Sequence, residues 1–298
     1  MSLAALQLIE KAPTLSYRTL HELADRFEPR VRKAFLEAVG RLQGSVTIRQ
    51  LQEAVESRNV NRVIDLLGWN QFDSGLRSMT DTLRAGIIEA GILAGGSMVG
   101  VVGRDLRFDI LNPASVSFIR QYEFDLIRSI SEETRNGIRA IVQNAFEEGG
   151  HPYQQAREIR MLIGLTERQM NAVSNYWDTL LETDMSATRA EELAMRYYGR
   201  LLNYRAKTIA RTETIRAAGM GREALWAQAV EEGLLNPITT RRSWLVTPDD
   251  RLCPVCQAIP QMNPGGVRLM EDFQSPVGLL DQEPAHPNCR CSVVLTAF

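Results

Sequence analysis

The chain has 298 residues, of which 44% are hydrophobic and 23% charged, and its formal net charge at pH 7 is −2. This composition is typical of a globular protein with one large or two modest domains, and it excludes wholesale disorder. The balance of 34 basic against 36 acidic residues excludes a global positive field that would draw the chain onto nucleic acid. Any contact with DNA is therefore expected to be local and salt-sensitive.

Residues 1–112 are predicted to form an N-terminal helical region. The first residues lack the basic start and long apolar core of a signal peptide, so we expect synthesis in a cytoplasm. Apolar residues recur every three or four positions over residues 15–41, which predicts a helix that Pro29 kinks or breaks. A capping box at Thr47 predicts a short helix, followed by a second short helix and a long one.

Residues 85–102 form a Gly- and Ala-rich apolar stretch with the length of a marginal membrane span. Glu89 interrupts the stretch, and its small residues lower its hydrophobicity. We therefore predict a buried helix and no stable membrane insertion. The small residues suit close helix–helix packing, including packing against a second copy or a partner.

The next residues break the helical period, and Asn112-Pro113 marks the predicted boundary between residues 1–112 and a second domain at 113–298. The second domain is predicted to be helical over 113–235, with the last helix broken at glycines near 199 and 219–221. Five helices are expected there, at 114–122, 124–148, 153–163, 166–180 and 186–233.

Residues 236–298 are predicted to form a small, loop-rich α+β knuckle. Alternation and β-branched or aromatic content predict a short strand over 241–247, and the part after it is rich in Pro and Gly and poor in helix signal. The expected fold class is therefore mainly α, with long helices followed by this C-terminal knuckle and its Cys/His cluster.

All four cysteines lie in the knuckle, as the pairs Cys253/Cys256 and Cys289/Cys291, and His286 precedes the second pair by three residues. Thiolate sulfur and imidazole nitrogen are the usual ligands of a tetrahedral Zn²⁺, and Cys-x-x-Cys supplies two ligands from one turn. The pattern predicts a structural zinc site that uses four of these five residues. A catalytic zinc is not expected, because the segment offers no general base beside the ligands.

Three other interpretations of the cysteines stay open at this point. Disulfides are the main alternative, because a particle that leaves the cell enters an oxidising medium. The cysteines could also be buried thiols that pack as small hydrophobic side chains. A redox dithiol is disfavoured, because no βαβ pattern surrounds Cys253-Pro-Val-Cys256.

A second group of polar residues lies in the long helix before the knuckle. Glu213 and Arg216 are three apart, and Thr212 and Arg216 are four apart, so these side chains share a helix face with a salt bridge as the plainest expectation. Alternatively, Arg211, Thr212 and Glu213 face the knuckle, where the arginine holds backbone carbonyls or carboxylates of its loops.

Taken in order, these segments resemble the Mu F-like minor head proteins of tailed bacteriophages. The resemblance is carried by Ile209-Ala-Arg211-Thr212-Glu213-Thr-Ile-Arg216-Ala, by Trp244 with Asp249-Asp-Arg251-Leu-Cys-Pro-Val-Cys256, and by His286-Pro-Asn-Cys-Arg-Cys291. It extends from about residue 113 to the C-terminus. On this basis residues Arg211 to Arg216, Trp244, Asp249 and Arg251 are expected to have structural or interaction roles.

The resemblance implies a head-morphogenesis protein without enzymatic activity, present in few copies inside the virion head near the portal vertex. The implied partners are the portal protein and, locally, the packaged DNA, with which some relatives are ejected. The long helices offer area for contacts with the major capsid or scaffold protein, and the Gly/Ala-rich stretch for contacts with further copies of the chain. Assembly is expected in the host cytoplasm.

Two rival functions are weighed against this one. One is an enzyme, a nuclease or a transferase acting on DNA or host protein, with Glu213, Arg216 and His286 as its site. The other is an ejected protein that penetrates the host envelope through residues 85–102.

Overall fold

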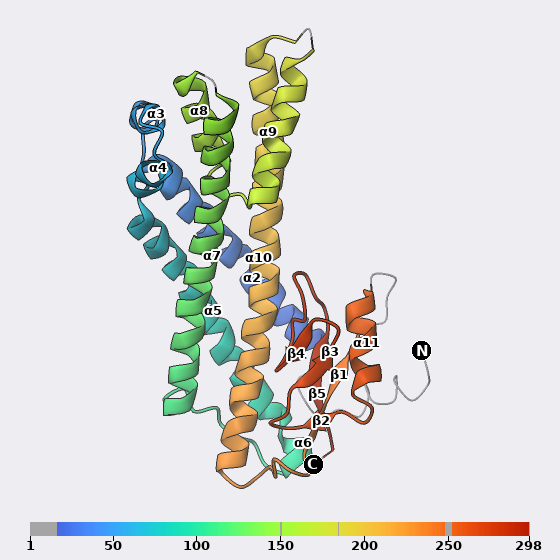
Figure 1. Ribbon diagram of the computed structural model, residues 1–298. Coiled ribbons are helices and arrows are strands. Elements are labelled where there is room, and N and C mark those ends of the chain that lie inside the picture. The colour runs from blue at the N-terminus through green and yellow to red at the C-terminus, as the bar shows by residue number, and fades with distance from the viewer. Residues whose placement is uncertain (1–16, 150, 184, 248–251, 298) are drawn as a thin grey trace. The chain divides into compact units, whose positions relative to one another are not determined.

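The computed structural model describes residues 17–149, 151–183, 185–247 and 252–297. Within them, long helices come first and a small region of strands and loops comes last, so the predicted fold class is confirmed (Figure 1). The helices are α2 (Tyr17–Gly44), α3 (Ile48–Glu56), α4 (Val60–Leu66), α5 (Trp69–Ser97), α6 (Val99–Val102), α7 (Pro113–Glu148), α8 (Pro152–Leu162), α9 (Glu167–Leu181), α10 (Ala187–Glu231) and α11 (Pro254–Met262). The strands are β1 (Arg241–Leu245), β2 (Val267–Arg268), β3 (Phe273–Ser275), β4 (Gly278–Leu280) and β5 (Ser292–Ala297).

The contacts divide the chain into two compact units that interleave along the sequence. Unit 1 comprises the described parts of Met1–Val31, Asp81–Ile119 and Thr208–Phe298, and unit 2 comprises Arg32–Thr80 and Arg120–Lys207. Each unit therefore draws on both predicted regions, 1–112 and 113–298. Those two limits follow from the sequence pattern and the resemblance, and they stay a prediction.

The helical part of unit 1 is a close packing of α2, α5 and α10. Leu20, Leu23 and Phe27 of α2 form a buried cluster with Ala90 of α5 and Ile215 of α10. These apolar positions of α2 lie three or four residues apart, so they share the face that becomes buried. The predicted periodicity of this helix is confirmed.

Small residues let α10 approach the Gly/Ala-rich part of α5. A Cβ atom added at Gly221 would lie 2.0 Å from the carbonyl oxygen of Ile87 and 2.8 Å from the amide nitrogen of Gly91, far inside van der Waals contact. The close helix–helix packing expected for residues 85–102 therefore exists between two helices of this chain.

One segment, Trp69–Val102, is long and apolar enough to cross a membrane by length and composition. Its most apolar 18-residue window has a mean hydropathy of 1.7, and 39% of that window is buried. Ile87, Ala90 and Ala94 face the interior of unit 1, whereas Ile92 and Val99 are exposed. The segment is thus a partly buried helix of the fold, and the absence of stable membrane insertion stays a prediction.

Unit 2 is helical and is held together by a buried arginine. The guanidinium of Arg205 is 4% exposed, and it donates to the carbonyl oxygen of Gly164 and to the hydroxyl of Thr134. It also forms an ion pair with Glu133 on α7, so it ties α10 to α7 and to the turn before α9. The capping boxes predicted at Thr47 and Thr166 are both present and start α3 and α9.

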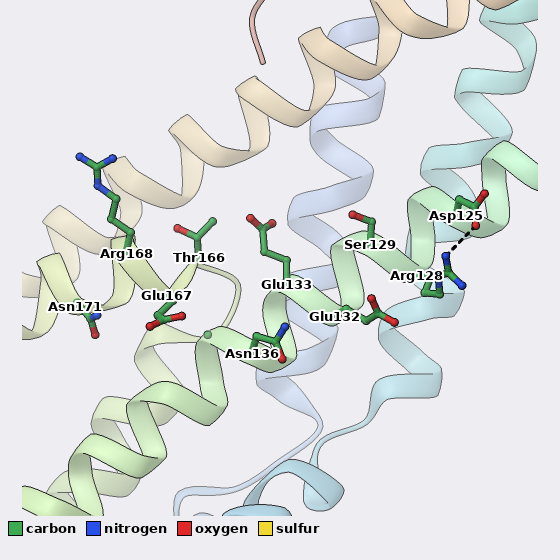
Figure 2. A pocket seen from close by; sticks show the side chains of 11 residues that line it. Asp125, Arg128, Ser129, Glu132, Glu133, Asn136, Thr166, Glu167, Arg168 and Asn171 are labelled. Carbon is green, nitrogen blue, oxygen red and sulfur yellow. Dashed lines mark ion pairs between the residues drawn. The ribbon is translucent and has the colours of Figure 1, made fainter. Parts of the chain in front are cut away.

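An open polar pocket lies in unit 2, beside α7 and the first turn of α9 (Figure 2). Glu132 and Glu133 of α7 and Glu167 of α9 line it, and Arg128 is paired with Asp125 at 3.3 Å. Carboxylates and cations alternate here, as is ordinary for a solvated surface.

Predicted breaks in three helices are wrong. Helix α2 continues through Pro29, whose ring is exposed, so the hydrogen bond that it removes lies on the solvent side, where water replaces it. Helix α7 is one helix rather than two, because no Gly or Pro interrupts it before Gly137. Helix α10 continues through Gly199 and Gly221, because helical glycines cost only about 1 kcal/mol each and tertiary packing outweighs that cost.

The C-terminal part of unit 1 contains a three-stranded antiparallel sheet of order β2-β1-β5, a β3–β4 hairpin and helix α11 (Figure 1). The strand predicted at 241–247 is confirmed as β1, in which Arg242 and Trp244 point inward. Helix α11 was not predicted. It starts within the first cysteine pair, after Cys253, and it contacts β1 and β3.

The cysteines belong to the hydrophobic core of this region. Cys256, Cys289 and Cys291 are at most 2% exposed and lie in one buried cluster with Trp226 of α10 and Trp244 of β1. The ring of Trp244 also contacts Phe273 edge to face, at 5.4 Å between centroids. The knuckle therefore packs directly on the C-terminal half of α10.

Candidate metal centre

The first cysteine pair is positioned by the start of α11. Cys253 is the N-cap of this helix, and its sulfur accepts a hydrogen bond from the backbone N–H of Cys256 at 3.4 Å. Pro254 occupies the first turn, where its missing N–H has no cost. The Cys-x-x-Cys spacing thus places both sulfurs at the N-terminal end of one helix, which favours negative charge.

The second group of ligands lies on the tight turn that leads into β5. The backbone N–H of Cys289 donates to the carbonyl oxygen of His286 at 3.1 Å, and Asn288 has a left-handed φ of 60°. Asparagine tolerates this conformation better than most residues. The turn brings His286 and Cys289 to the same side, and Cys291 follows directly before β5.

The five donors form two overlapping triads. Cys253, Cys256 and His286 have their ligand atoms within 4.8 Å of one another, and so do Cys256, Cys289 and Cys291. The Nε2 atom of His286 lies 3.1 Å from the sulfur of Cys253 and 3.1 Å from that of Cys256. The sulfurs of Cys256 and Cys289 are 3.6 Å apart. Cys256 is common to both triads and is therefore at the centre of the cluster.

These distances fit a tetrahedral metal better than a disulfide. Zinc–sulfur bonds of about 2.3 Å at tetrahedral angles place neighbouring ligand atoms roughly 3.5 to 3.8 Å apart. A disulfide needs about 2.05 Å between sulfurs, and all four cysteines are free thiols. The structure thus brings all five predicted ligands together, supports a metal-binding cluster and has no disulfide among them.

The tautomer of His286 is set by its backbone contact. Its Nδ1 atom lies 2.8 Å from the carbonyl oxygen of Pro287, and a carbonyl can only accept a hydrogen bond. Nδ1 therefore carries the proton, and the lone pair of Nε2 faces the sulfurs of Cys253 and Cys256. This arrangement, with the outer nitrogen held by an oxygen acceptor, is typical of metal-binding histidines.

Hydrogen bonds among the thiols of Cys256, Cys289 and Cys291 shift their pKa values. Hydrogen bonds from Cys256 and Cys291 to the thiolate of Cys289 lower the pKa of Cys289, and the bond with Cys289 raises the pKa of Cys256. For Cys291, the bond with Cys256 favours the thiolate, but the bond with Cys289 and burial outweigh it and raise the pKa to about 12. Three adjacent thiolates would repel one another, whereas a bound metal would stabilise the ionised form of each of its ligands.

Trp244, a predicted interaction residue, lies against the second triad. Its buried indole N–H has no oxygen or nitrogen partner, and its interaction with Cys291 favours the thiolate of that cysteine. The backbone of the same turn is fixed at Arg290, whose carbonyl oxygen accepts from Thr247 at 2.6 Å and lies 3.1 Å from Nε2 of His21. Burial lowers the pKa of His21 despite that backbone contact, so its neutral form is favoured.

Thr212 joins α10 to the metal-binding turn. Its hydroxyl accepts a hydrogen bond from the backbone N–H of Asn288 at 3.0 Å, and the hydroxyl of Thr208 accepts one from the side chain of Asn288 at 3.2 Å. Asn288 stands between the ligands His286 and Cys289. The expectation that this face of α10 meets the knuckle therefore holds for Thr212.

The other predicted residues of α10 have different contacts. Arg211 pairs with Asp25 at 3.2 Å and Glu28 at 3.4 Å, both on α2, and with no loop of the knuckle among the residues that the structure describes. Glu213 and Arg216 form the expected salt bridge along the helix, at 3.3 Å.

Asp249 and Arg251, the last two predicted interaction residues, lie outside the described residues.

A buried charge network at the knuckle had no clear signal in the sequence. Arg222 of α10 and Glu283 are each 0% exposed and make two hydrogen bonds of 2.9 Å. Glu223 pairs with Arg242 of β1 at 3.1 Å and with Arg222 at 3.4 Å. Because Glu283 lies three residues before His286, this network fixes the loop that carries the histidine ligand to α10.

No protein-family model, curated protein or solved structure matches this chain. The assignment of the Cys/His cluster therefore rests on its own donor atoms and distances.

Proposed function

We propose that the cluster binds one structural Zn²⁺. The support is the donor set of four thiols and one imidazole, which suits a borderline-soft ion, and its burial in the core of the knuckle. When bound, the ion would neutralise the thiolates and link α11 to the turn before β5. The knuckle has too few residues to build a large hydrophobic core of its own, and the free energy of metal binding would supply part of its stability.

Cys256 is the ligand on which the proposal depends most. A single ion needs four donors, so it must draw on both triads, and Cys256 is the one residue that belongs to each. His286 presents its Nε2 lone pair, and Cys253 and Cys289 are the sulfurs in contact with this central pair. Cys291 is the fifth donor, held beside Trp244.

We further propose that the protein is a minor head protein of a tailed bacteriophage with a structural role at the portal vertex. One observation carries this proposal. The two segments of the resemblance, around Arg211-Thr212-Glu213 and around His286 to Cys291, meet through the hydrogen bond between Thr212 and Asn288. Segments separated by 76 residues thus act as one structural motif, which is what a shared family architecture requires.

In this proposal the protein assembles in the host cytoplasm and ends inside the head, in few copies. Its partners are the portal protein and the major capsid or scaffold protein, with local contact to packaged DNA, ejection with that DNA in some systems, and self-association. We propose no catalytic activity. His286 faces sulfurs and Glu213 bonds to Arg216, so the three residues of the rival enzyme site have structural partners.

The test is co-expression with the portal protein encoded in the same genome, followed by affinity isolation of portal rings. The chain is expected in the isolated rings and, by mass spectrometry, in purified heads. Its absence from heads that contain portal and capsid proteins would overturn the proposal. Nuclease or transferase activity that is lost on replacing Glu213, Arg216 and His286 would support the enzyme instead.

The variant Cys253→Ser/Cys256→Ser tests whether incorporation into heads depends on zinc binding. It is expected to lose zinc and to reduce incorporation into heads. The matched double variant Ser57→Ala/Ser97→Ala, which changes two side chains that bond only to their own helices, is expected to retain both.

A further inference from the structure

A cavity of about 450 Å³ lies in unit 1 between α10 and the loops that flank the β3–β4 hairpin. Its apolar wall includes Ala227 and Trp226 of α10 and Leu269 of the loop after β2. This volume falls in the range of small-molecule sites, which combine apolar walls with a few polar groups. None of the predicted metal ligands lines it.

The lining carries an excess of negative charge. Four carboxylates and the guanidinium of Arg242 line the cavity, and because Glu223 is paired with both Arg222 and Arg242, the excess negative charge is that of Glu231, Asp272 and Asp281. Asp272 and Asp281 are exposed at the mouth and come from the two loops. A concave site that combines carboxylates with an apolar wall concentrates the negative electrostatic field and so attracts cations.

The one arginine is already engaged. Arg242 pairs with Glu223 at 3.1 Å, donates to the carbonyl oxygen of Glu271 at 2.7 Å and stacks over the ring of Phe273 at 5.2 Å. It is 4% exposed, so it is a fixed part of the wall rather than a group that can move out to bind an anion.

A buried acceptor in the lining lacks a donor. Gln282 is 5% exposed, and its side-chain carbonyl oxygen has no hydrogen-bond partner. That oxygen is closed to solvent and lies beside Gly219 of α10, which does not line the cavity, so the acceptors that a ligand can reach are the carboxylates of Asp272 and Asp281. Ammonium and guanidinium groups donate and carry positive charge, whereas carboxylates and phosphates only accept.

We propose that this cavity binds an organic cation, an ammonium or guanidinium group carried on an apolar body. The charged end lies near Asp272 and Asp281, and the apolar body lies on Ala227 and Leu269. A free alkyl amine and a lysine side chain of a partner protein present the same chemistry. The two sources differ in how much apolar body accompanies the charge.

The probes for the test are n-hexylammonium, n-hexanol and hexanoate, which share one apolar body and differ in charge, and N-acetyl-lysine methylamide. Binding is followed by the shift of the Trp226 indole N–H signal in ¹⁵N–¹H spectra, because Trp226 is the only tryptophan in the lining. Hexylammonium is expected to bind at least tenfold more tightly than hexanol, and hexanoate is expected not to bind. Stronger binding of the lysine amide than of hexylammonium would identify a protein side chain as the source.

Two variants test the site itself. Asp272→Asn/Asp281→Asn is expected to weaken hexylammonium binding about tenfold and leave hexanol unchanged, because only the charge interaction is removed. The matched control Asp65→Asn/Asp81→Asn removes two exposed carboxylates outside the cavity and is expected to change neither affinity. Equal binding of the three hexyl probes, or no shift of the Trp226 signal with any probe, would overturn the proposal.

Discussion

The substitution Glu283→Gln tests how the histidine-bearing loop is held on α10. It keeps the size of the side chain but removes the carboxylate that makes two hydrogen bonds of 2.9 Å with Arg222. Both side chains are 0% exposed, so the remaining guanidinium stays in a site that water does not reach. Removing one partner of such a buried pair costs about 3–5 kcal/mol.

The lower end of that range is expected. Glu223 lies 3.4 Å from the Arg222 guanidinium and still offsets part of its charge, so we expect the free energy of unfolding to fall by about 3 kcal/mol. The measurement is the urea unfolding midpoint and slope of zinc-saturated protein. The matched control is Glu271→Gln, which removes an ion pair with Arg268 whose two side chains are each 51% exposed and should cost under about 1 kcal/mol.

A double variant separates lost charge pairing from lost packing. Arg222→Met/Glu283→Met removes both charges, and it is expected to be less destabilised than Glu283→Gln, because no unpaired buried charge remains. Equal stability losses for Glu283→Gln and Glu271→Gln would refute the reasoning, since burial would then make no difference to the pair.

Three further predictions follow from single sites. Cys256→Ser is expected to abolish zinc retention, because Cys256 is the residue that belongs to both triads. Cys291→Ser is expected to keep part of it, because Cys256 still joins Cys253 and His286 to Cys289. Metal content after dialysis against a weak chelator distinguishes the two variants. Because folding lowers the pKa of His21, the unfolded chain binds more protons than the folded one at mildly acidic pH, and the free energy of unfolding falls as pH falls through about 6.5. His21→Gln should make this pH dependence shallower in unfolding experiments from pH 7.5 to 5.5. Equal slopes for the variant and the unchanged protein would exclude the effect. Gly221→Ala is expected to destabilise the protein by about 1–3 kcal/mol, since its Cβ would lie 2.0 Å from a backbone oxygen. Gly199→Ala has open space around it and should stabilise the protein by about 0.5–1 kcal/mol. Thermal unfolding of both variants checks this contrast.

Local chemistry made part of this structure predictable. The capping boxes at Thr47 and Thr166 specify helix starts through side chains three residues apart, and both helices begin there. The cysteine pairs and His286 were expected to meet because metal ligands must converge. The strand at β1 followed from its alternation of inward and outward residues.

The errors came from residues whose role depends on tertiary contacts. Gly221 interrupts no helix, because its missing side chain makes room for α5. Helix α11 was missed because Cys253 is not one of the usual N-cap residues and because Pro260 lies inside the helix, although Pro254 in the first turn is an ordinary start signal. The pairing of Arg222 with Glu283 joins residues 61 positions apart, and no spacing rule within one element predicts it.

The contact between Thr212 and Asn288 lies between these two cases. The sequence suggested that this face of α10 meets the knuckle, but it assigned the contact to an arginine. A helix residue of modest length can reach a turn that packs directly on the helix, whereas Arg211 extends away to the carboxylates of α2. Which neighbour a side chain reaches is therefore decided by helix packing and not by the motif.

The central claim is that four of the five donors, the four thiols and His286, bind one structural Zn²⁺. The direct measurement is elemental analysis of protein purified from a reducing cytoplasm without added metal, combined with titration of accessible thiols before and after chelation. We expect about one zinc per chain, thiols that become reactive when zinc is removed, and loss of stability in the same step. Metal-free protein that is fully folded and equally stable, with or without a cysteine–cysteine crosslink, would contradict the claim.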